Sequence, residues 1–294
     1  MRLAAKPPEE EEMSMEKYCD LHAHSNVSDG SLTPTQLLRL AEQSGLSAVV
    51  LSDHNSVAGL PEFTEAARNS PVEAVPAVEF STEYENIELH ILALYVRPEH
   101  YDAINTLLED FKRRKELSNL ALIKALREAG YDLDYDTIRG NHGYVNRAHI
   151  AEAMTQKGYT ASVQEAFKTL LSPKRGYYVP PKRPDVFETI RFIKSMGAVA
   201  VLAHPFLNLD EVQLRTFLPM AVSCGLDAME TMYAKYDPET TARAKALAKE
   251  YGILESGGSD FHGSAKPDIA LGRGRGDLRI PLKVLELLKK KKNP

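Results

Sequence analysis

The stretch Asp20-Leu21-His22-Ala23-His24 is the key to the architecture of this chain, and Ser28-Asp29-Gly30 follows it closely. Its two histidines lie one residue apart at the end of a short apolar run that predicts a β-strand, and Asp29 comes five residues later. Imidazole and carboxylate groups together suit borderline divalent metals such as Mn²⁺, Fe²⁺ and Zn²⁺. A His-x-His pair alone also fits a solvated strand, so the rest of the sequence must separate a metal site from a surface pair.

The composition is typical of a globular protein in water. The chain has 294 residues, 43% hydrophobic and 26% charged, with a formal net charge of −5. This charge gives no general reason to expect binding to nucleic acid or to an anionic membrane, and no apolar run is long enough to predict a membrane span. Two cysteines, Cys19 and Cys224, are too few for a disulfide framework and favour a cytoplasmic location. Residues 1–16, with Pro7-Pro8 and the acidic run at 9–12, predict a disordered lead.

The positions of the histidines are more informative than their number. Seven strands are predicted, at 18–21, 46–51, 74–80, 87–94, 198–203, 226–231 and 253–256. Helical segments between most of them indicate a parallel sheet, in which functional groups gather at the carboxyl ends of the strands. Residues whose side chains can bind a metal ion (His, Asp or Glu) lie at nearly every such strand end, although His90 lies in the first half of its strand. Neighbouring strands are about 4.8 Å apart, so only closure into a seven-stranded barrel brings all these ends round one pocket.

A helical segment interrupts this pattern. Apolar residues recur at helical spacing from about 98 to 130, and further helices are predicted over 146–157, 162–171 and 184–196. The chain therefore divides into a barrel, 17–111 plus 186–294, and an inserted small helical domain, 112–185, which we expect to cap the substrate.

Three other stretches have simpler interpretations. The basic run at 112–115 predicts a solvated helix face, and the lysine run at 289–292 predicts a solvated tail. The glycine-rich segment at 270–276 follows no strand, so we expect a flexible connection and no phosphate-cradling loop.

Six motifs in order resemble those of the PHP (polymerase and histidinol phosphatase) family. They are Asp20-Leu21-His22-Ala23-His24 with Asp29, Ser52-Asp53-His54-Asn55, Pro76-Ala77-Val78-Glu79, Leu89-His90-Ile91, Ala203-His204-Pro205 and Ser259-Asp260-Phe261-His262. The resemblance implies a distorted (β/α)₇ barrel that binds two to three divalent metal ions, Mn²⁺, Fe²⁺ or Zn²⁺, and hydrolyses phosphate esters.

The same resemblance implies a set of metal ligands. The first ion would take His22, His24, Glu79 and Asp260; the second Glu79, His90 and His204; the third Asp29, His54 and His262. Each of these positions holds an acceptable donor. Asp53 is expected to orient a ligand imidazole, and Glu230, at the end of its strand, is expected to play a similar part.

Two segments of the insertion, Asn146-Arg147-Ala148-His149-Ile150 and Leu171 to Tyr178, look like those of the nucleotide-cleaving branch of this family. Members of that branch remove a phosphate from 3′,5′-nucleoside bisphosphates or trim RNA from its 5′ end. The resemblance implies that Arg147 and Lys174 hold the substrate phosphate, where a bidentate guanidinium is favourable. For Arg147, a surface arginine at the start of a helix is the alternative.

The resemblance implies a phosphoesterase that acts on nucleotides. The expected substrate is the 3′-phosphate of a 3′,5′-nucleoside bisphosphate or an AMP-like molecule, attacked by a hydroxide that bridges two metal ions. Alternatives are a 5′→3′ exoribonuclease that uses the same site on short RNA, and a histidinol-phosphate phosphatase. A non-catalytic metal-binding module would be missing a ligand, and none is missing. The sequence leaves the oligomeric state and the proton donor to the leaving oxygen open.

Overall fold

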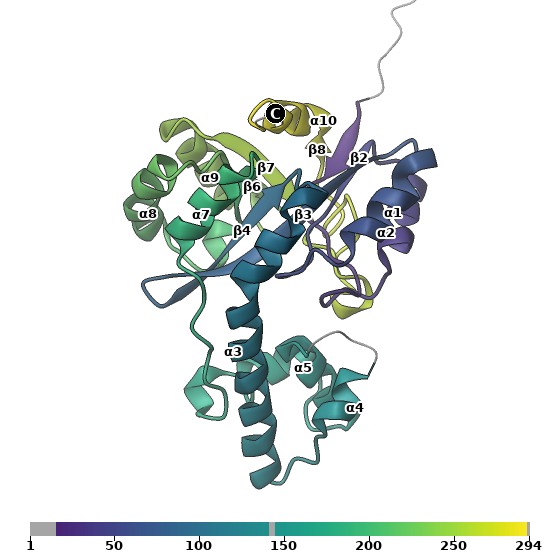
Figure 1. Ribbon diagram of the computed structural model, residues 1–294, viewed down its shortest axis with the longest axis vertical. Helices are drawn as coiled ribbons and strands as arrows, with labels where there is room; N and C mark the ends of the chain where they lie inside the picture. Colours follow the sequence, from purple (N-terminus) through teal and green to yellow (C-terminus); the bar gives the residue numbers. More distant parts are fainter. Residues whose placement is uncertain (1–15, 141–144, 293–294) are drawn as a thin grey trace, which may run out of the picture.

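Eight strands curl into a nearly closed barrel with helices packed round its outside (Figure 1). The computed structural model describes residues 16–140 and 145–292, so the predicted lead lies outside the described residues except for Glu16. The strands are β1 (Tyr18–Asp20), β2 (Ala48–Leu51), β3 (Glu73–Tyr84), β4 (Ile87–Leu94), β5 (Val199–Ala203), β6 (Ala228–Tyr233), β7 (Leu254–Gly258) and β8 (Ile280–Pro281).

The helices follow the predicted order along the chain. They are α1 (Pro34–Gln43), α2 (Leu60–Ala66), α3 (Tyr101–Glu128), α4 (Tyr135–Arg139), α5 (Arg147–Gln156), α6 (Val163–Lys168), α7 (Val186–Ser195), α8 (Glu211–Ser223), α9 (Pro238–Glu250) and α10 (Leu282–Lys289). Short 3₁₀ turns are η1 (Ala67–Asn69), η2 (Pro98–His100), η3 (Pro173–Arg175), η4 (Pro205–Leu207) and η5 (Gly263–Ala265). None of the helices in the described ranges is both long and apolar enough to cross a membrane.

The direction of β4 corrects the expectation of a parallel sheet. The strand order is β7-β6-β5-β4-β3-β2-β1-β8, and β4 runs antiparallel to both β3 and β5. Only Glu85 and Asn86 connect β3 to β4, and both have positive φ, 48° and 65°. A two-residue link with left-handed backbone makes a hairpin, whereas a parallel pair needs a crossover of about a dozen residues. This reversal brings His90, in the first half of β4, to the edge where the parallel strands end.

The barrel closes where the end of β7 meets the segment after β1. The amide of Asp260 donates to the carbonyl of His22, and the amide of His24 donates to the carbonyl of Phe261, both at 2.9 Å. A Cβ atom at Gly258 would lie 2.2 Å from Cβ of His22, so this approach requires glycine. Closure therefore occurs at the edge that carries the histidines.

Two apolar layers support the barrel. On β2, Ala48 and Val50 face a cluster inside the barrel, while Val49 and Leu51 face a larger cluster under the surrounding helices. Leu285 and Leu288 of α10 fill the amino-terminal end of the interior. The opposite half of the barrel interior lies outside this apolar cluster and is occupied by polar side chains.

The helix α3 extends from the barrel into a separate group of helices (Figure 1). Its first half joins the barrel core through Leu108 and Phe111, and its second half joins a third apolar cluster shared with α5 and α6. The chain returns to the barrel just before α7, where the amide of Glu83 donates to the carbonyl of Pro184. We call residues 112–185 the cap.

The glycine-rich segment at 270–276 is ordered, contrary to the sequence-based expectation. Leu271 is buried, and the amide of Gly272 donates to Asp20 Oδ2 at 2.7 Å. Asp20 also accepts from the amide of Ser259, so this buried carboxylate joins three segments of the chain. Nothing in the sequence indicated this role. Cys19 and Cys224 are buried free thiols.

Candidate active site

Glu79 occupies the centre of a cluster of imidazoles at the closed edge of the barrel. Its Oε1 lies 2.8 Å from His90 Nδ1 and 3.2 Å from His204 Nε2. Its Oε2 lies 2.9 Å from His54 Nδ1, and 3.3 and 3.4 Å from Nε2 of His24 and His22. The side chain of Glu79 is fully buried. Five histidines from four segments of sequence therefore converge on one carboxylate.

All nine residues predicted as metal ligands meet in this region. Sets whose ligand atoms lie within 4.8 Å of one another are His24–Asp29–His54–His262, His22–His24–Asp260, His22–Glu79–His204 and His54–Glu79–His90. These four sets overlap with the three that the sequence resemblance implies, and His22, His24, His54 and Glu79 each belong to two of the four. The division of the ligands among individual ions therefore stays a prediction.

The donor atoms fit divalent cations. Glu79 Oε2, Asp29 Oδ1 and His24 Nδ1 are buried and, although ionisable groups lie close to them, none of the three atoms is hydrogen-bonded. Buried polar atoms in folded proteins are nearly always hydrogen-bonded, so several exceptions at one point indicate another partner. Imidazole nitrogen and carboxylate oxygen without thiolate suit Mn²⁺, Fe²⁺ or Zn²⁺.

The charges of the cluster also favour bound cations. Burial alone would raise the pKa of the Glu79 carboxyl, but the imidazoles of His54, His90 and His22 hold that pKa well below its usual range. Burial would lower the pKa of His90, yet Glu79 and Glu88 raise it to about 10. The carboxylates therefore stabilise positive charge at this place, which bound metal ions would supply.

Glu230 of β6 holds two of these histidines from outside the cluster. Its Oε1 lies 3.0 Å from His22 Nδ1, and its Oε2 accepts from the amide of His204 at 2.6 Å. A carboxylate on Nδ1 leaves Nε2 directed toward Glu79. This agrees with the part expected for Glu230.

Asp53 has a different set of partners from those expected. Its carboxylate accepts from the amide and hydroxyl of Ser25, at 2.8 and 2.6 Å, and from the hydroxyl of Ser28 at 2.6 Å. These bonds order the loop that carries Asp29. The structure thus shows Asp53 acting on a loop, where the sequence predicted contact with an imidazole.

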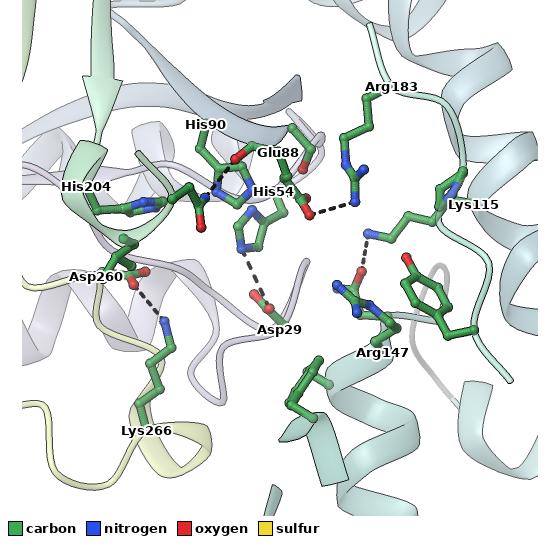
Figure 2. Close-up of a pocket in the computed structure, with 18 of the residues that line it drawn as sticks. Asp29, His54, Glu88, His90, Lys115, Arg147, Arg183, His204, Asp260 and Lys266 are labelled. Carbon is green, nitrogen blue, oxygen red and sulfur yellow. Dashed lines mark hydrogen bonds and ion pairs between the residues drawn. The ribbon is translucent and has the colours of Figure 1, made fainter. Parts of the chain in front are cut away.

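A cavity of about 300 Å³ opens over the histidine cluster, between the barrel and the cap (Figure 2). Basic residues line two of its sides. Lys115, Arg147 and Arg183 belong to the cap side, and Lys235 and Lys266 to the barrel side. Lys266 Nζ lies 2.7 Å from Asp260 Oδ2, which also accepts from the hydroxyl of Tyr233 at 2.8 Å.

The structure brings Arg147 to the cavity and leaves Lys174 outside. Arg147 is the first residue of α5, and its guanidinium lies 4.1 Å from the ring centre of Tyr178 and 5.4 Å from that of Phe167. Lys174, on η3, is exposed and is not among the residues that line the cavity. A cationic residue near it in sequence, Arg175, is exposed as well.

Sequence reasoning missed Lys115 and Arg183. Lys115 was expected on a solvated helix face, but it lines the cavity and donates to Asn146 Oδ1. Burial, together with the charges of Arg147 and Arg183, lowers the pKa of Lys115 to about 8. The spacing of Phe111, Lys115 and Asn119, which all line the cavity, could have indicated this face of α3.

Arg183 is linked to the histidine cluster by Glu88. The Arg183 guanidinium donates to Glu88 Oε2 at 2.6 Å, and Glu88 Oε1 lies 3.2 Å from His90 Nε2. Burial would raise the pKa of Glu88, but His90 and the arginines Arg183 and Arg147 hold it well below its usual range. Nothing in the sequence marked this pair, because its members are 95 residues apart.

The family comparison agrees with the order of the motifs. A family model described as PHP domain matches residues 20–178. A solved structure from Bifidobacterium adolescentis, described as a metal-dependent phosphoesterase, superposes with a TM-score of 0.83 and 26% identity. That superposition covers 95% of this chain and 97% of the other.

Curated relatives carry three related activities in their names. A 5′-3′ exoribonuclease of Haemophilus influenzae is 32% identical over 84% of this chain and 91% of its own length. A phosphoribosyl 1,2-cyclic phosphate 1,2-diphosphodiesterase of Eggerthella lenta is 31% identical, over 83% of this chain and 94% of its own. A 3′,5′-nucleoside bisphosphate phosphatase of Chromobacterium violaceum is 25% identical, over 83% and 86%. All three names denote hydrolysis of phosphate esters.

Proposed function

Since the chain belongs to the PHP domain family and is a metal-dependent phosphoesterase, we propose that its substrates are nucleotides. The proposed reaction is hydrolysis of the 3′-phosphate of 3′,5′-nucleoside bisphosphates, or of AMP-like monoesters. The observation that carries this proposal is a cavity with a metal-type cluster at its base and cationic side chains on its cap side.

We propose that two to three divalent ions, Mn²⁺, Fe²⁺ or Zn²⁺, are held by the nine residues named above. When bound, such ions lower the pKa of water and neutralise phosphoryl oxygens. Glu79 can serve two ions because its two oxygens face different histidines. Asp29, on the loop ordered by Asp53, supplies a carboxylate beside His54 and His262.

The chain's own groups position the substrate. Glu230 fixes the ring of His22 and therefore the direction of its Nε2. Arg147 offers a guanidinium for phosphate oxygens, in an orientation supported by the ring of Tyr178. We propose that the cap, residues 112–185, covers the reacting groups and limits the access of water.

The second candidate is 5′→3′ exoribonuclease activity at the same site. A further hollow of about 680 Å³ adjoins the cavity and shares Arg147, Tyr178 and Arg183 with it. An aromatic ring beside basic side chains suits a single-stranded chain that extends past the reacting phosphate into the adjoining hollow. The relative from Haemophilus influenzae carries that name, which supports this candidate for the present chain.

A panel of substrates with added Mn²⁺ tests the proposal. We expect adenosine 3′,5′-bisphosphate or a 5′-phosphorylated oligoribonucleotide to be hydrolysed with a higher kcat/KM than AMP or histidinol phosphate. The double variant His22→Ala, Asp260→Ala should abolish the activity, whereas His100→Ala, in η2, should retain it. Best turnover of histidinol phosphate, or full activity of the double variant, would reject the proposal.

A further inference from the structure

We infer that Tyr233 and Lys266 restrict Asp260 to a single donor oxygen and thereby determine which divalent ion the site prefers. Both side chains contact the Oδ2 atom of Asp260, which leaves Oδ1 for a metal ion. We call Tyr233 and Lys266 the Asp260 clamp. The inference rests on the proposed function, because it takes Asp260 to be a metal ligand. Neither residue of the clamp lies in the six motifs of the sequence.

The two oxygens of Asp260 have different surroundings. Oδ2 accepts from the hydroxyl of Tyr233 at 2.8 Å and lies 2.7 Å from Lys266 Nζ. Oδ1 lies 3.3 Å from His24 Nε2 and 3.7 Å from His22 Nε2, within one of the groups of donor atoms that could hold an ion. A hydroxyl and an ammonium together engage the lone pairs of Oδ2. Asp260 therefore offers one oxygen to an ion.

The backbone of Asp260 is fixed where the barrel closes. Its φ is 55°, a left-handed conformation that aspartate adopts more readily than most residues do. Its amide donates to the carbonyl of His22 at 2.9 Å. Because the backbone is held and Oδ2 is engaged, the carboxylate cannot turn to offer both oxygens while the Asp260 clamp is in place.

An irregularity in β6 brings Tyr233 to this position. The register of β6 against β7 shifts between Glu230 and Met232, so that β6 contains one residue more than its partner. In a regular strand, residues three positions apart, such as Glu230 and Tyr233, face opposite sides of the sheet. The bulge changes this alternation, and both side chains reach the cluster, Glu230 at His22 and Tyr233 at Asp260. Bulges next to active sites commonly redirect a side chain in this way.

Lys266 reaches Asp260 from the segment that follows the last motif. The amide of Lys266 donates to the carbonyl of Gly263 at 3.1 Å, and the amide of Ser264 donates to Ser31 Oγ at 2.9 Å. These bonds attach the segment to the barrel. Figure 2 shows the side chain of Lys266 directed at Asp260. Among residues 16–140 and 145–292, Lys266 pairs with no other carboxylate, so its charge acts on a proposed metal ligand.

The number of oxygens that a carboxylate offers affects the choice of ion. Zn²⁺ in proteins nearly always has four ligands, whereas Mn²⁺ favours octahedral sites with six. A carboxylate that supplies one oxygen suits the lower number, and one that supplies two oxygens suits the higher. The Asp260 clamp therefore favours Zn²⁺ over Mn²⁺ relative to the same site without the clamp.

The ratio of two metal affinities tests this inference without any substrate. Chelator-treated protein is titrated with Zn²⁺ and with Mn²⁺ in competition with a chromophoric chelator. Tyr233→Phe removes the hydroxyl but keeps the ring that packs on His204, and Lys266→Met removes the ammonium. Each variant should shift the affinity ratio at least about tenfold toward Mn²⁺, because Zn²⁺ loses a fixed ligand while Mn²⁺ gains the second oxygen. The ratio cancels any change in charge that acts equally on two divalent ions.

Two matched variants control for general loosening of the protein. Lys194→Met removes a lysine of similar burial, whose Nζ lies 2.6 Å from Asp227 Oδ2 just before the start of β6. Tyr251→Phe removes a hydroxyl that contacts only the backbone of Arg215 among the described residues. Both variants should have the affinity ratio of the wild-type protein. Thermal unfolding of the chelator-treated proteins shows that each variant is folded before it is titrated.

The possible outcomes separate this inference from the proposed function. An unchanged ratio in both Tyr233→Phe and Lys266→Met would overturn the inference alone, whatever the absolute affinities. An equal shift in Lys194→Met would also overturn it, because the cause would then lie outside the Asp260 clamp. A wild-type protein that binds neither ion would reject the proposed metal sites, and the inference with them.

Discussion

At the scale of single residues, the site depends on carboxylates that fix histidines. Glu230 contacts His22 through one oxygen and the backbone of His204 through the other, although it belongs to none of the expected ligand sets. Glu230 is fully buried, so both contacts are shielded from water and fix the His22 imidazole closely.

Replacing Glu230 with Gln should weaken metal binding. The amide retains the shape of the side chain but cannot stabilise the Nδ1–H of His22 as a carboxylate does, so we expect metal affinity to fall about 10- to 100-fold. Titration of chelator-treated protein with Mn²⁺ measures this. Glu255→Gln is the matched control, because Glu255 is a partly exposed residue of the neighbouring strand β7. Equal affinity in the two variants would show that Glu230 does not support the site.

Asp53 is expected to contribute to stability through the loop that it holds. In Asp53→Ala the hydroxyls of Ser25 and Ser28 and the amide of Ser25 lose their acceptor, which should lower the free energy of unfolding by about 3 kcal/mol. Urea unfolding measures the change, and the exposed Asp136→Ala should alter it by less than about 0.5 kcal/mol. A loss below about 1 kcal/mol would contradict the role assigned to these bonds.

The residues of the site differ in how far the sequence reveals them. Glu79 and His204 were predictable because each was expected at or just after the end of a buried strand, and strand ends gather at one edge. In the structure β3 continues past Glu79 to Tyr84. Arg183 was not, since its partner Glu88 is remote in sequence and basic residues occur throughout the cap. Lys174 illustrates the same limit, because a motif indicates a segment without indicating which side chain turns inward.

At the scale of elements, the hairpin of β3 and β4 places His90. The length of the link between the two strands was visible in the sequence and already excluded a parallel pair, because a crossover needs many more residues. Hydrophobic periodicity predicted both strands but not their direction, since the apolar pattern of a buried strand reads the same either way. The helices predicted between 98 and 196 lie close to those observed because helix start signals are local, as at Ser162, whose hydroxyl caps α6.

Replacing Glu85 with Asn should stabilise this hairpin. Glu85 has a φ of 48°, a left-handed conformation that Asn tolerates better than a longer side chain does. We expect the free energy of unfolding to rise by about 0.5–1 kcal/mol. Urea denaturation measures this, and Glu83→Asn, within the extended part of β3, should produce no gain. A decrease with Glu85→Asn would show that its backbone is not strained in solution.

At the scale of the whole molecule, barrel and cap have separate apolar cores and meet at the cavity. The barrel could be anticipated because a closed sheet was the sole arrangement that gathers every strand end. The contact between barrel and cap could not be anticipated, because it depends on how α3 directs Lys115 toward α5. The apolar spacing of a long helix that packs against two groups of elements does not determine which face meets which group.

Removal of metal should destabilise the whole protein. Ions that bind the folded chain alone add about 2.7 kcal/mol at a concentration of 100 times Kd, and the buried carboxylates of Glu79, Asp29 and Asp260 would lose this compensation. We expect a chelator to lower Tm by about 5 °C and Mn²⁺ to restore it. The variant Glu79→Gln should show a much smaller response to chelator and metal. An unchanged Tm in the wild-type protein would contradict metal binding at this cluster.

The carboxylate of Glu88 has a consequence for how the two halves of the cavity communicate. One oxygen faces an imidazole of the histidine cluster and the other faces a guanidinium of the cap. An anion that draws Arg183 toward itself leaves more of the negative charge of Glu88 to His90, and this makes the imidazole a stronger donor to a cation. Linkage requires the reverse effect to be equal in free energy, so cation and phosphate should each tighten the binding of the other. The enzyme would then retain its metal most firmly while its substrate is bound.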